Sequence, residues 1–257
     1  MQKKAPDKGT SAQQATGFSR ILSQNVLSLW ESPSGEIWAG TFGNGAFVLD
    51  AQGHVLHHFS EQHGLTNGSV LSIGGDARKV WLATLGGVTA LSADGQGKLQ
   101  VQPELGTSYV YKVFTDSRGR TWFGTDGKGL AMLENGSLRF FTTANGTALK
   151  TIYSIAEDQR GNIWFCTDRE GVFCFDGLHF QQFTEANGLH SQHITGLAAD
   201  GNGLLVIAYE DGFDLLNPGR VNHLTFCDES IGAPGAGVNL NAICRDGLGN
   251  VWLGTKD

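Results

Sequence analysis

Nine residues with side chains suited to ligand binding lie in or beside short polar loops of the sequence. They are Asn44, Tyr111, Asp126, Lys128, Tyr153, Arg169, Glu170, His193 and Asn241. Tyrosine rings can stack on a sugar, and the amide, carboxylate and cationic groups can form hydrogen bonds with its hydroxyls. Loops on a rigid scaffold are favoured ligand sites, so these residues predict a site for a small molecule or an oligosaccharide. The alternative is that each is a solvated turn residue.

The sequence contains no pattern typical of a metal site, a cofactor site or a catalytic triad. Among the 8 histidines, His54 and His58 have H-x-x-x-H spacing, but His58 lies on an expected outermost strand, where solvated side chains are expected, and this spacing marks a metal site on a helix. No Ser-His-Asp order stands out. The glycine-rich turns are short and lead into expected strands, so they cannot hold a phosphate at a helix N-terminus. We therefore expect this region to use no metal and no cofactor, and to be non-catalytic.

The cysteines allow two interpretations. The sequence contains Cys166, Cys174, Cys227 and Cys244, without C-x-x-C spacing. Cys166 and Cys174 flank one expected hairpin turn and could lie directly opposite each other, where an oxidising compartment would permit a disulfide. The equivalent positions of other repeats hold small or apolar residues. This pattern favours core packing over a disulfide.

The stretch from Thr151 to Gly177 contains the element that must position the candidate residues. It reads TIYSIAEDQRGNIWFCTDREGVFCFDG. This pattern predicts three short strands at 152–157, 162–167 and 172–175, separated by polar turns that end in glycine. A fourth expected strand, at 179–183, follows at once. Four strands joined by tight turns predict an antiparallel meander.

The same unit recurs along the chain. Its second strand carries an anchor residue, with successive spacings of 43, 41, 42, 42 and 46 residues. The anchors are Trp38, Trp81, Trp122, Trp164, Val206 and Trp252. A small residue lies two positions after each anchor, a glycine opens the third strand, and an aspartate usually lies six positions before the anchor. Agreement at several independent positions identifies a repeat protein.

The repeat predicts an all-β fold, a β-propeller of four-stranded antiparallel blades. The second strand does not alternate between apolar and polar residues, since the segment IWFC at 163–166 is apolar throughout. A sheet with one face in water would alternate, so both faces must be covered, as in blades that stack around an axis. The tryptophan and the small residue two positions later share one face, where neighbouring blades can interlock.

The propeller is expected to be incomplete, with five full blades plus half of a sixth. We place the propeller domain at residues 17–257, with full repeats at about 25–65, 66–107, 108–150, 151–189 and 190–238 and the half repeat from 239. An open propeller would leave unpaired sheet edges, so we expect a chain truncated at its C-terminal end. Residues 1–16 are polar and without periodicity, which predicts a disordered tail or linker.

Charge and hydropathy argue against several partners. The net charge is −7, with 25 acidic and 18 basic residues, which disfavours nucleic acid and anionic membrane surfaces. The basic start is not followed by the apolar run of a signal peptide, so we expect no targeting signal in this chain. No stretch of about 18 apolar residues could span a bilayer. We expect no membrane contact by this segment itself.

Several copies of the unit resemble the two-component regulator propeller repeat. The best matches are DSRGRTWFGT at 116–125 and DGLGNVWLGT at 246–255. The segments GLTN from Gly64 and GLHS from Gly188 resemble the family's lead-in to the next blade. The resemblance covers roughly residues 17–257, and the fifth copy departs most because it lacks the tryptophan.

The resemblance implies a place in a larger signalling protein. Repeats of this family form the periplasmic sensor region of bacterial receptors, which continue into a further β domain, a transmembrane helix and a histidine kinase or other output module. In several members from gut bacteria the signal is a carbohydrate fragment, passed on through rearrangement of a dimer. The resemblance therefore implies a periplasmic, non-catalytic, ligand-binding region of a homodimeric receptor.

Two other classes of protein stay open. Propeller lyases, such as those acting on streptogramins, have a similar tryptophan-containing repeat and use His, Glu and Mg²⁺ on one face. In this chain His193 and Glu170 are the only plausible pair for that chemistry. A protein-interaction scaffold would instead present an exposed apolar patch and no polar pocket.

Overall fold

The computed structural model of the chain describes residues 25–93, 95, 98–220, 224–228, 230 and 237–255. The expected tail at 1–16 lies outside the described residues, as does the start of the expected propeller domain at 17–24. Within the described residues, the strands form five four-stranded sheets and two two-stranded sheets. Neighbouring strands pair antiparallel, as the meander pattern predicts.

The first three blades follow the repeat boundaries expected from the sequence. Blade 1 contains β1 (Val26–Glu31), β2 (Ile37–Thr41), β3 (Ala46–Leu49) and β4 (Val55–Phe59). Blade 2 contains β5 (Val70–Gly75), β6 (Lys79–Thr84), β7 (Gly87–Ser92) and β8 (Gln100–Val101). Blade 3 contains β9 (Val110–Thr115), β10 (Thr121–Thr125), β11 (Leu130–Glu134) and β12 (Ser137–Phe141).

The remaining blades follow in the same order. Blade 4 contains β15 (Ile152–Glu157), β16 (Ile163–Thr167), β17 (Val172–Phe175) and β18 (Phe180–Phe183). Blade 5 contains β19 (Gly196–Ala199), β20 (Leu205–Ala208), β21 (Phe213–Leu216) and β22 (Leu224–Cys227). The half blade contains β23 (Val238–Arg245) and β24 (Val251–Thr255).

Five short elements lie between blades. The strands β13 (Thr143–Ala144) and β14 (Thr147–Ala148) form a small hairpin after blade 3. Single turns of 3-10 helix lie at η1 (Glu61–His63), η2 (Pro103–Leu105) and η3 (Glu185–Asn187). After η1 and η3, Gly64 and Gly188 adopt a left-handed conformation and end the turn. These glycines open the GL segments that lead into the next blade.

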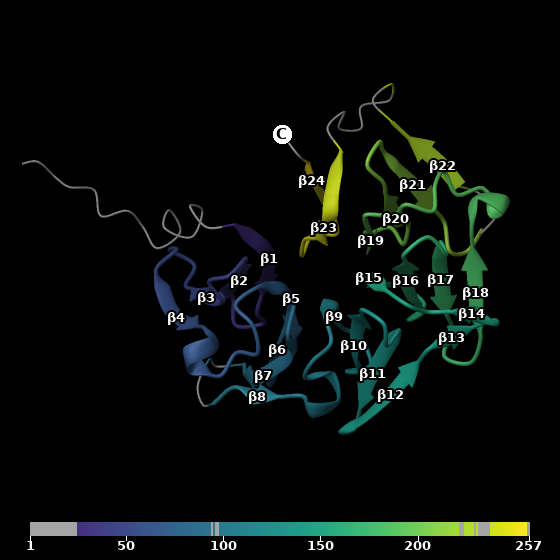
Figure 1. Cartoon of the computed structure of the whole chain (residues 1–257). Helices are drawn as coiled ribbons and strands as arrows, with labels where there is room; N and C mark the ends of the chain where they lie inside the picture. The colour runs from purple at the N-terminus through teal and green to yellow at the C-terminus, as the bar shows by residue number, and fades with distance from the viewer. Residues whose placement is uncertain are drawn as a thin grey trace, which may run out of the picture.

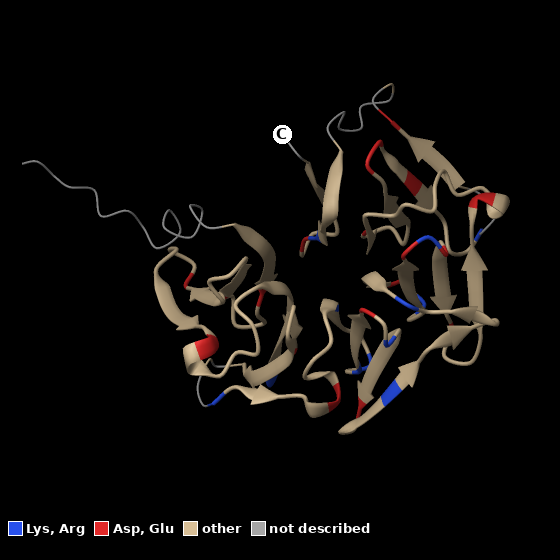
Figure 2. Ribbon diagram, in the orientation of Figure 1, with Lys and Arg blue, Asp and Glu red and all other residues tan. Residues whose placement is uncertain are grey.

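The blades are arranged around a central channel, which makes the fold a β-propeller (Figure 1). The first strand of each blade lies on the inside and the fourth on the outside. Each inner strand contacts the inner strand of the next blade, in the order β1, β5, β9, β15, β19 and β23. The repeat therefore places equivalent residues of different blades around one channel. Figure 2 shows that the charged residues lie mainly in turns and loops, while the strands are largely uncharged.

The tryptophan column holds neighbouring blades together, as the sequence predicts. The Trp164 side chain of blade 4 is buried against Leu197 and Ile207 of blade 5. The Trp122 side chain of blade 3 packs in the same way against Ile155 and Phe165 of blade 4. Each such contact removes a large aromatic surface from water on a face that would otherwise be wet. Both faces of the inner strands are therefore covered.

The aspartate column orients the tryptophans. In each of three blades, an aspartate Oδ2 accepts a hydrogen bond from the indole Nε1 six residues later. The pairs are Asp116 with Trp122 at 2.8 Å, Asp158 with Trp164 at 2.9 Å and Asp246 with Trp252 at 2.9 Å. The Oδ1 atom of each aspartate accepts backbone N–H groups of its own turn. One side chain thus fixes both the turn and the rotamer of the anchor.

The two ends of the described arc expose residues that are buried elsewhere. Trp252 on β24 is 61% exposed, while the other anchor side chains are buried. Leu29 on β1 is 63% exposed, while its equivalents Ile73 and Val113 are buried. The cause is that no described blade lies beyond β24 or before β1. Trp252 is therefore the one anchor that no described blade covers.

The strand register rules out the disulfide that the sequence left open. Cys174 lies opposite Trp164, and Cys166 lies opposite Val172, so the two cysteines do not face each other. Both thiols are free and buried, and burial raises the pKa of Cys166 and of Cys174 to about 12. Both residues fill the core, which was the favoured interpretation.

Candidate functional site

A β-bulge at the same place in four inner strands inserts one extra residue into each strand. The register shifts between Val26 and Ser28 in β1, and the equivalent shift recurs in β5, β9 and β15. The extra residues are Leu27, Leu71, Tyr111 and Tyr153. Bulges redirect side chains and are frequent beside functional sites. The bulge residues are therefore leucines in blades 1 and 2, where both line the channel cavity, and tyrosines in blades 3 and 4.

The two bulge tyrosines form a pair across the boundary between blades 3 and 4. The ring centroids of Tyr111 and Tyr153 are 5.1 Å apart, with the planes at 64°. Each ring is half-buried, which leaves part of its surface free. Burial raises the pKa of both phenols, and the carboxylates of Asp126 and Asp168 raise it further. Both hydroxyls are therefore neutral at physiological pH and can donate hydrogen bonds.

Two carboxylates flank this pair from the loops between the second and third strands. The Thr151 hydroxyl donates to Asp126 Oδ1 at 2.8 Å, and residues 126 and 151 also form a backbone bridge. Asp168 occupies the equivalent loop of blade 4 and is exposed. Exposed carboxylates beside aromatic rings can accept hydrogen bonds from sugar hydroxyls while the rings stack on the sugar. We name Tyr111, Tyr153, Asp126 and Asp168 the tyrosine site.

The structure thus brings together three residues predicted from the sequence, Tyr111, Tyr153 and Asp126. Asp168 was missed, although it stands at the same loop position of blade 4 as Asp126 of blade 3. Aligning the repeats loop by loop would have found it. The sequence of a single repeat contains no pattern that predicts the β-bulge at the tyrosines.

Other predicted residues have local structural roles. Lys128 Nζ donates to the Glu104 carbonyl at 2.8 Å, which ties its loop to η2. Arg169 has a left-handed backbone, with φ of 69°, and its exposed side chain lies 3.8 Å from the Asp168 carboxylate. The carbonyl of Asn44 accepts the ring N–H of His58 at 2.7 Å. These contacts stabilise the turns themselves. The role of these residues in ligand binding therefore stays a prediction.

The possible lyase pair is not joined by any contact within the described part of the chain. Glu170 follows the turn of blade 4, and its backbone N–H donates to the Thr167 hydroxyl. His193 lies in the connection to blade 5, where its backbone N–H donates to the Ser191 hydroxyl. Both side chains are exposed. In the described residues, no group of three or more His, Cys, Asp or Glu residues could hold a metal ion.

Asn241, the last predicted residue, lies in the half blade and has an unusual conformation. Its φ is 58°, and its backbone N–H donates to the Thr195 carbonyl of blade 5 at 2.7 Å. The side-chain Oδ1 is buried and has no partner within the described residues. Asn241 lines a cavity of about 370 Å³ in the channel, together with residues of β1, β5, β9 and β24.

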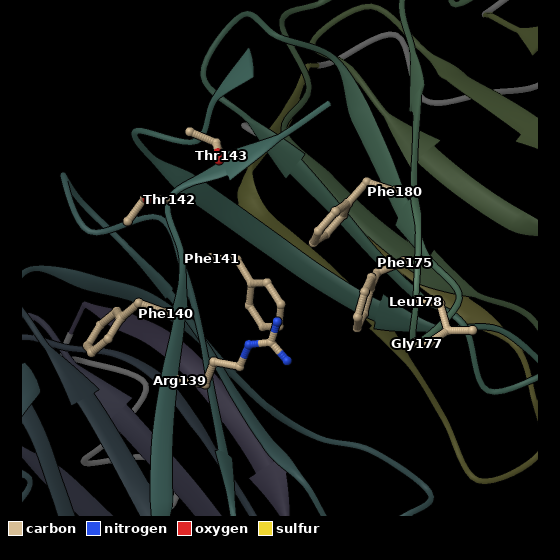
Figure 3. A pocket seen from close by; sticks show the side chains of 9 residues that line it. All are labelled: Arg139, Phe140, Phe141, Thr142, Thr143, Phe175, Gly177, Leu178 and Phe180. Carbon is tan, nitrogen blue, oxygen red and sulfur yellow. The ribbon is translucent and has the colours of Figure 1, made fainter. Parts of the chain in front are cut away.

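A second cavity, of about 420 Å³, lies on the outer rim between blades 3 and 4 (Figure 3). Its wall is a cluster of Phe141, Phe175 and Phe180, with the last two rings stacked at 4.6 Å. The Arg139 guanidinium lies 4.5 Å from the Phe141 ring centroid. This cavity contains none of the predicted site residues.

Blade 5 replaces the usual hydroxyl contacts with ionisable groups. The Tyr209 hydroxyl donates to Asp214 Oδ2 at 2.6 Å, and the His190 backbone N–H donates to the same atom at 2.9 Å. The His190 ring lies 2.9 Å from Asp211 and stacks on Phe226. In blade 2, Thr84, Thr89 and Thr66 occupy the equivalent positions. Asp214 is fully paired inside the blade, so the cluster serves packing.

Comparison with protein families identifies the repeat. Residues 148–169 match a family model described as two component regulator propeller. The chain contains a two component regulator propeller repeat. The matched segment includes Tyr153 and Asp168 of the tyrosine site. No curated protein matches the sequence. In the described residues, no helix is long and apolar enough to cross a membrane.

Solved structures with this repeat architecture share the fold. The extracellular domain of a hybrid two component system of B. thetaiotaomicron is 22% identical, with a TM-score of 0.76. The similarity covers 90% of this chain and 32% of that one, so the chain spans about a third of its length. A second such domain from the same organism is 18% identical, with a TM-score of 0.60, over 90% of this chain and 40% of the other.

Enzymes of the same architecture are also similar. Virginiamycin B lyase from Staphylococcus aureus is 14% identical, with a TM-score of 0.70. The similarity covers 90% of this chain and 77% of the lyase. At such identities the similarity concerns the fold alone, and function depends on the site.

Proposed function

We propose that the chain is the ligand-binding propeller of the sensor region of a bacterial two-component-type receptor, and that it is non-catalytic. The tyrosine site carries the proposal: two half-buried rings with neutral hydroxyls pair on the inner strands beside two exposed carboxylates. This combination suits a saccharide, because aromatic rings stack on the apolar face of the sugar and carboxylates accept hydrogen bonds from its hydroxyls. The similar extracellular domains of hybrid two component systems support a sensor role.

The proposal includes a location and a mode of signalling. A sensor region of this kind would lie outside the cytoplasm, in the periplasm, and would act within a homodimeric receptor. The ligand would bind to the rigid inner strands, and the receptor would transmit the change through its subunit arrangement. Neither nucleic acid nor membrane lipid is a proposed partner, in keeping with the net charge of −7.

Binding to a panel of oligosaccharides tests the proposal. We expect at least one sugar to raise the melting temperature of the chain, because a ligand that binds only the folded state stabilises it. Tyr111→Ala and Tyr153→Ala should each weaken binding by roughly two- to ten-fold, given about 0.5 to 1.5 kcal/mol for a ring contact. Phe42→Ala removes an exposed ring on another blade and should leave affinity unchanged. If no sugar stabilised the chain, or if both tyrosine variants bound normally, the proposal would fail.

The lyase alternative has a direct test. The similarity to virginiamycin B lyase concerns the fold, and no observed contact joins His193 and Glu170 in the part of the chain that the structure describes. We expect no loss of a streptogramin substrate when it is incubated with the chain and Mg²⁺. If the chain degraded the streptogramin and the His193→Ala variant did not, the chain would be a lyase and the sensor proposal would be wrong.

A further inference from the structure

The connection between blades 3 and 4 departs from the other connections of the repeat. At the other boundaries between full blades, a single turn of 3-10 helix precedes the next inner strand, at η1, η2 and η3. Between blades 3 and 4 the hairpin of β13 and β14 takes that place. Asn145 Nδ2 of the hairpin donates to the Phe180 carbonyl of β18 at 2.7 Å, and Thr147 Oγ1 donates to Gln182 Oε1 at 3.4 Å. The hairpin is therefore fixed on the outer strand of blade 4.

Blade 4 also carries a pair of aromatic residues where other blades carry aliphatic pairs. Phe175, the last residue of β17, lies opposite Phe180, the first residue of β18. The equivalent pairs in blades 1, 3 and 5 are Leu49 with Val55, Leu133 with Leu138 and Leu216 with Leu224. The rings of Phe175 and Phe180 stack on each other, and both contact the ring of Phe141 from blade 3. Three phenyl rings therefore meet on the outer rim.

Arg139 is the only lysine or arginine in its column of fourth-strand residues. It lies opposite Met132, and the residues at this place in blades 1, 2, 4 and 5 are His57, Gln100, Gln181 and Thr225. The Arg139 guanidinium lies over the Phe141 ring (Figure 3), and no carboxylate of the described residues forms an ion pair with it. A guanidinium can bind a carboxylate through two parallel hydrogen bonds. The rim thus presents a cation that can still receive an anion.

The hairpin, the phenyl rings and the arginine border the same cavity of about 420 Å³ (Figure 3). Thr142 and Thr143 line it where the hairpin begins, and Leu178, which is 83% exposed, lines it from the last turn of blade 4. Pockets that hold small ligands measure roughly 300 to 1,000 Å³. Between blades 4 and 5, the equivalent of Phe141 is Phe183, which packs in one core cluster with Leu216 and Leu224. The residues that set this boundary apart from the repeat therefore line a cavity of ligand size.

We propose that this rim cavity binds a small aromatic carboxylate, with its ring against Phe175 and Phe180 and its carboxylate on Arg139. Aromatic rings favour stacked and edge-to-face contacts with other aromatic rings, and the guanidinium fork matches a carboxylate. A neutral aromatic molecule would not use the cation, and an anion without a ring would not use the phenyl rings. The cavity lies on outer strands, whereas the tyrosine site lies on the inner strands β9 and β15. The inference therefore goes beyond the proposed function and does not rest on it.

The compounds 3-phenylpropionate and 3-phenylpropan-1-ol test the site because they differ in one group, a carboxylate in place of a hydroxymethyl. Their affinities for the full chain would be measured by ligand-observed NMR at constant ionic strength and pH 7, where the acid is ionised. We expect the acid to bind roughly ten-fold tighter, the effect of a charge-assisted hydrogen bond. Arg139→Gln, which copies Gln100 and Gln181, should abolish this preference without changing the affinity for the alcohol. Arg118→Gln removes an exposed arginine after β9 and should leave both affinities unchanged.

Phe180→Leu tests the aromatic wall, because leucine occupies this position in blades 3 and 5, and its melting curve verifies folding. It should weaken the binding of both compounds by roughly two- to ten-fold. Equal binding of the acid and the alcohol to the unmodified chain, or a preference that persists in Arg139→Gln, would overturn the site. Binding that Tyr153→Ala abolishes and Phe180→Leu leaves unchanged would place the acid at the tyrosine site and would also overturn the inference. Hexanoate that bound as tightly as 3-phenylpropionate would overturn the aromatic ligand.

Discussion

The indole N–H of Trp38 is fully buried and has no hydrogen-bond partner within the described residues. At the position where other blades carry aspartate, blade 1 carries Ser32, whose hydroxyl accepts the Glu36 N–H at 3.1 Å. The serine thus replaces the aspartate Oδ1 that holds the turn. It has no second oxygen to reach the indole, so the donor stays unsatisfied.

The double change Ser32→Asp and Glu36→Asn should therefore stabilise the chain. It copies blade 4, where Asn162 Nδ2 donates to Asp158 Oδ2 at 2.9 Å, and it removes the repulsion that Glu36 would exert on a new carboxylate. We expect a gain of about 1 to 2 kcal/mol in the free energy of unfolding, the effect of satisfying a buried donor. Urea denaturation would measure it.

The control for this design is Glu36→Asn alone, which leaves the Trp38 N–H unpaired and should change stability by less than about 0.5 kcal/mol. The design would be wrong if the single and double variants unfolded at the same urea concentration.

The stability of the folded chain should depend on pH through Asp246. Side-chain hydrogen bonds from Asn250 and Trp252 lower the pKa of Asp246 to about 2. The folded pKa lies below the unfolded value of about 3.9, so the charged form stabilises the fold above pH 4, and this contribution disappears as pH falls to 2. Asp246→Asn should destabilise the chain at pH 7 and have almost no effect at pH 2. An equal effect at both pH values would contradict the assignment.

At the scale of the element, the position that opens each third strand requires glycine because the backbone at the end of the fourth strand lies close to it. The Thr167 hydroxyl donates to the Gly171 carbonyl, and the equivalent bond recurs in blades 1, 2 and 3. Gly171 has a φ of 80°, and a Cβ there would collide with the Phe183 carbonyl. The glycine lets the third strand start directly beside the end of the fourth.

Gly171→Ala should therefore destabilise the chain by about 3 kcal/mol or more, from the collision and the left-handed backbone together. Gly177→Ala is the matched control, because Gly177 has a φ of 105° but no atom within 4 Å of the added Cβ. It should cost about 1 to 2 kcal/mol. Thermal unfolding of both variants would measure the difference. Similar costs would show that backbone conformation alone selects glycine.

At the scale of the molecule, the described arc ends in two faces of complementary type. At one end lies the anchor Trp252, and in the other blades the equivalent anchors pack on the following blade. At the other end lies Leu29, and in the other blades the equivalent residues are buried by the preceding blade. Inside the arc, such faces meet at each blade boundary. We propose that each of these faces can bind a further blade of the same kind, because it exposes apolar residues that are buried at the other blade boundaries.

Fluorescence quenching tests this proposal. In the present chain, acrylamide should quench an emission component that Trp252→Phe removes, because Trp252 is 61% exposed. In a longer chain that carries a further blade of this repeat, the component should be protected. The Trp164→Phe variant is a control, since it removes a buried ring and should leave the quenchable component in place. Equal quenching of the short and long chains would refute the covering blades.

The sequence by itself determined the repeat, the strand order within a blade and the packing of the tryptophans. These features depend on local patterns that recur: the hydrogen bond between Asp158 and Trp164 and the turn at Gly171 form within one blade, so a single copy contains the signal. The observed strands 152–157 and 172–175 coincide with the prediction.

The tertiary structure alone decided which residues share the channel. The bulge that directs Tyr111 and Tyr153 to one place, and the curvature that puts Lys112 beside the half blade, arise from how blades pair and turn about an axis. The sequence could not give the register that separates Cys166 from Cys174, because a shift of one residue changes every opposite pair. The spacing of residues along the chain determines the strands of each blade, whereas the arrangement of the blades around the axis determines which side chains contact one another.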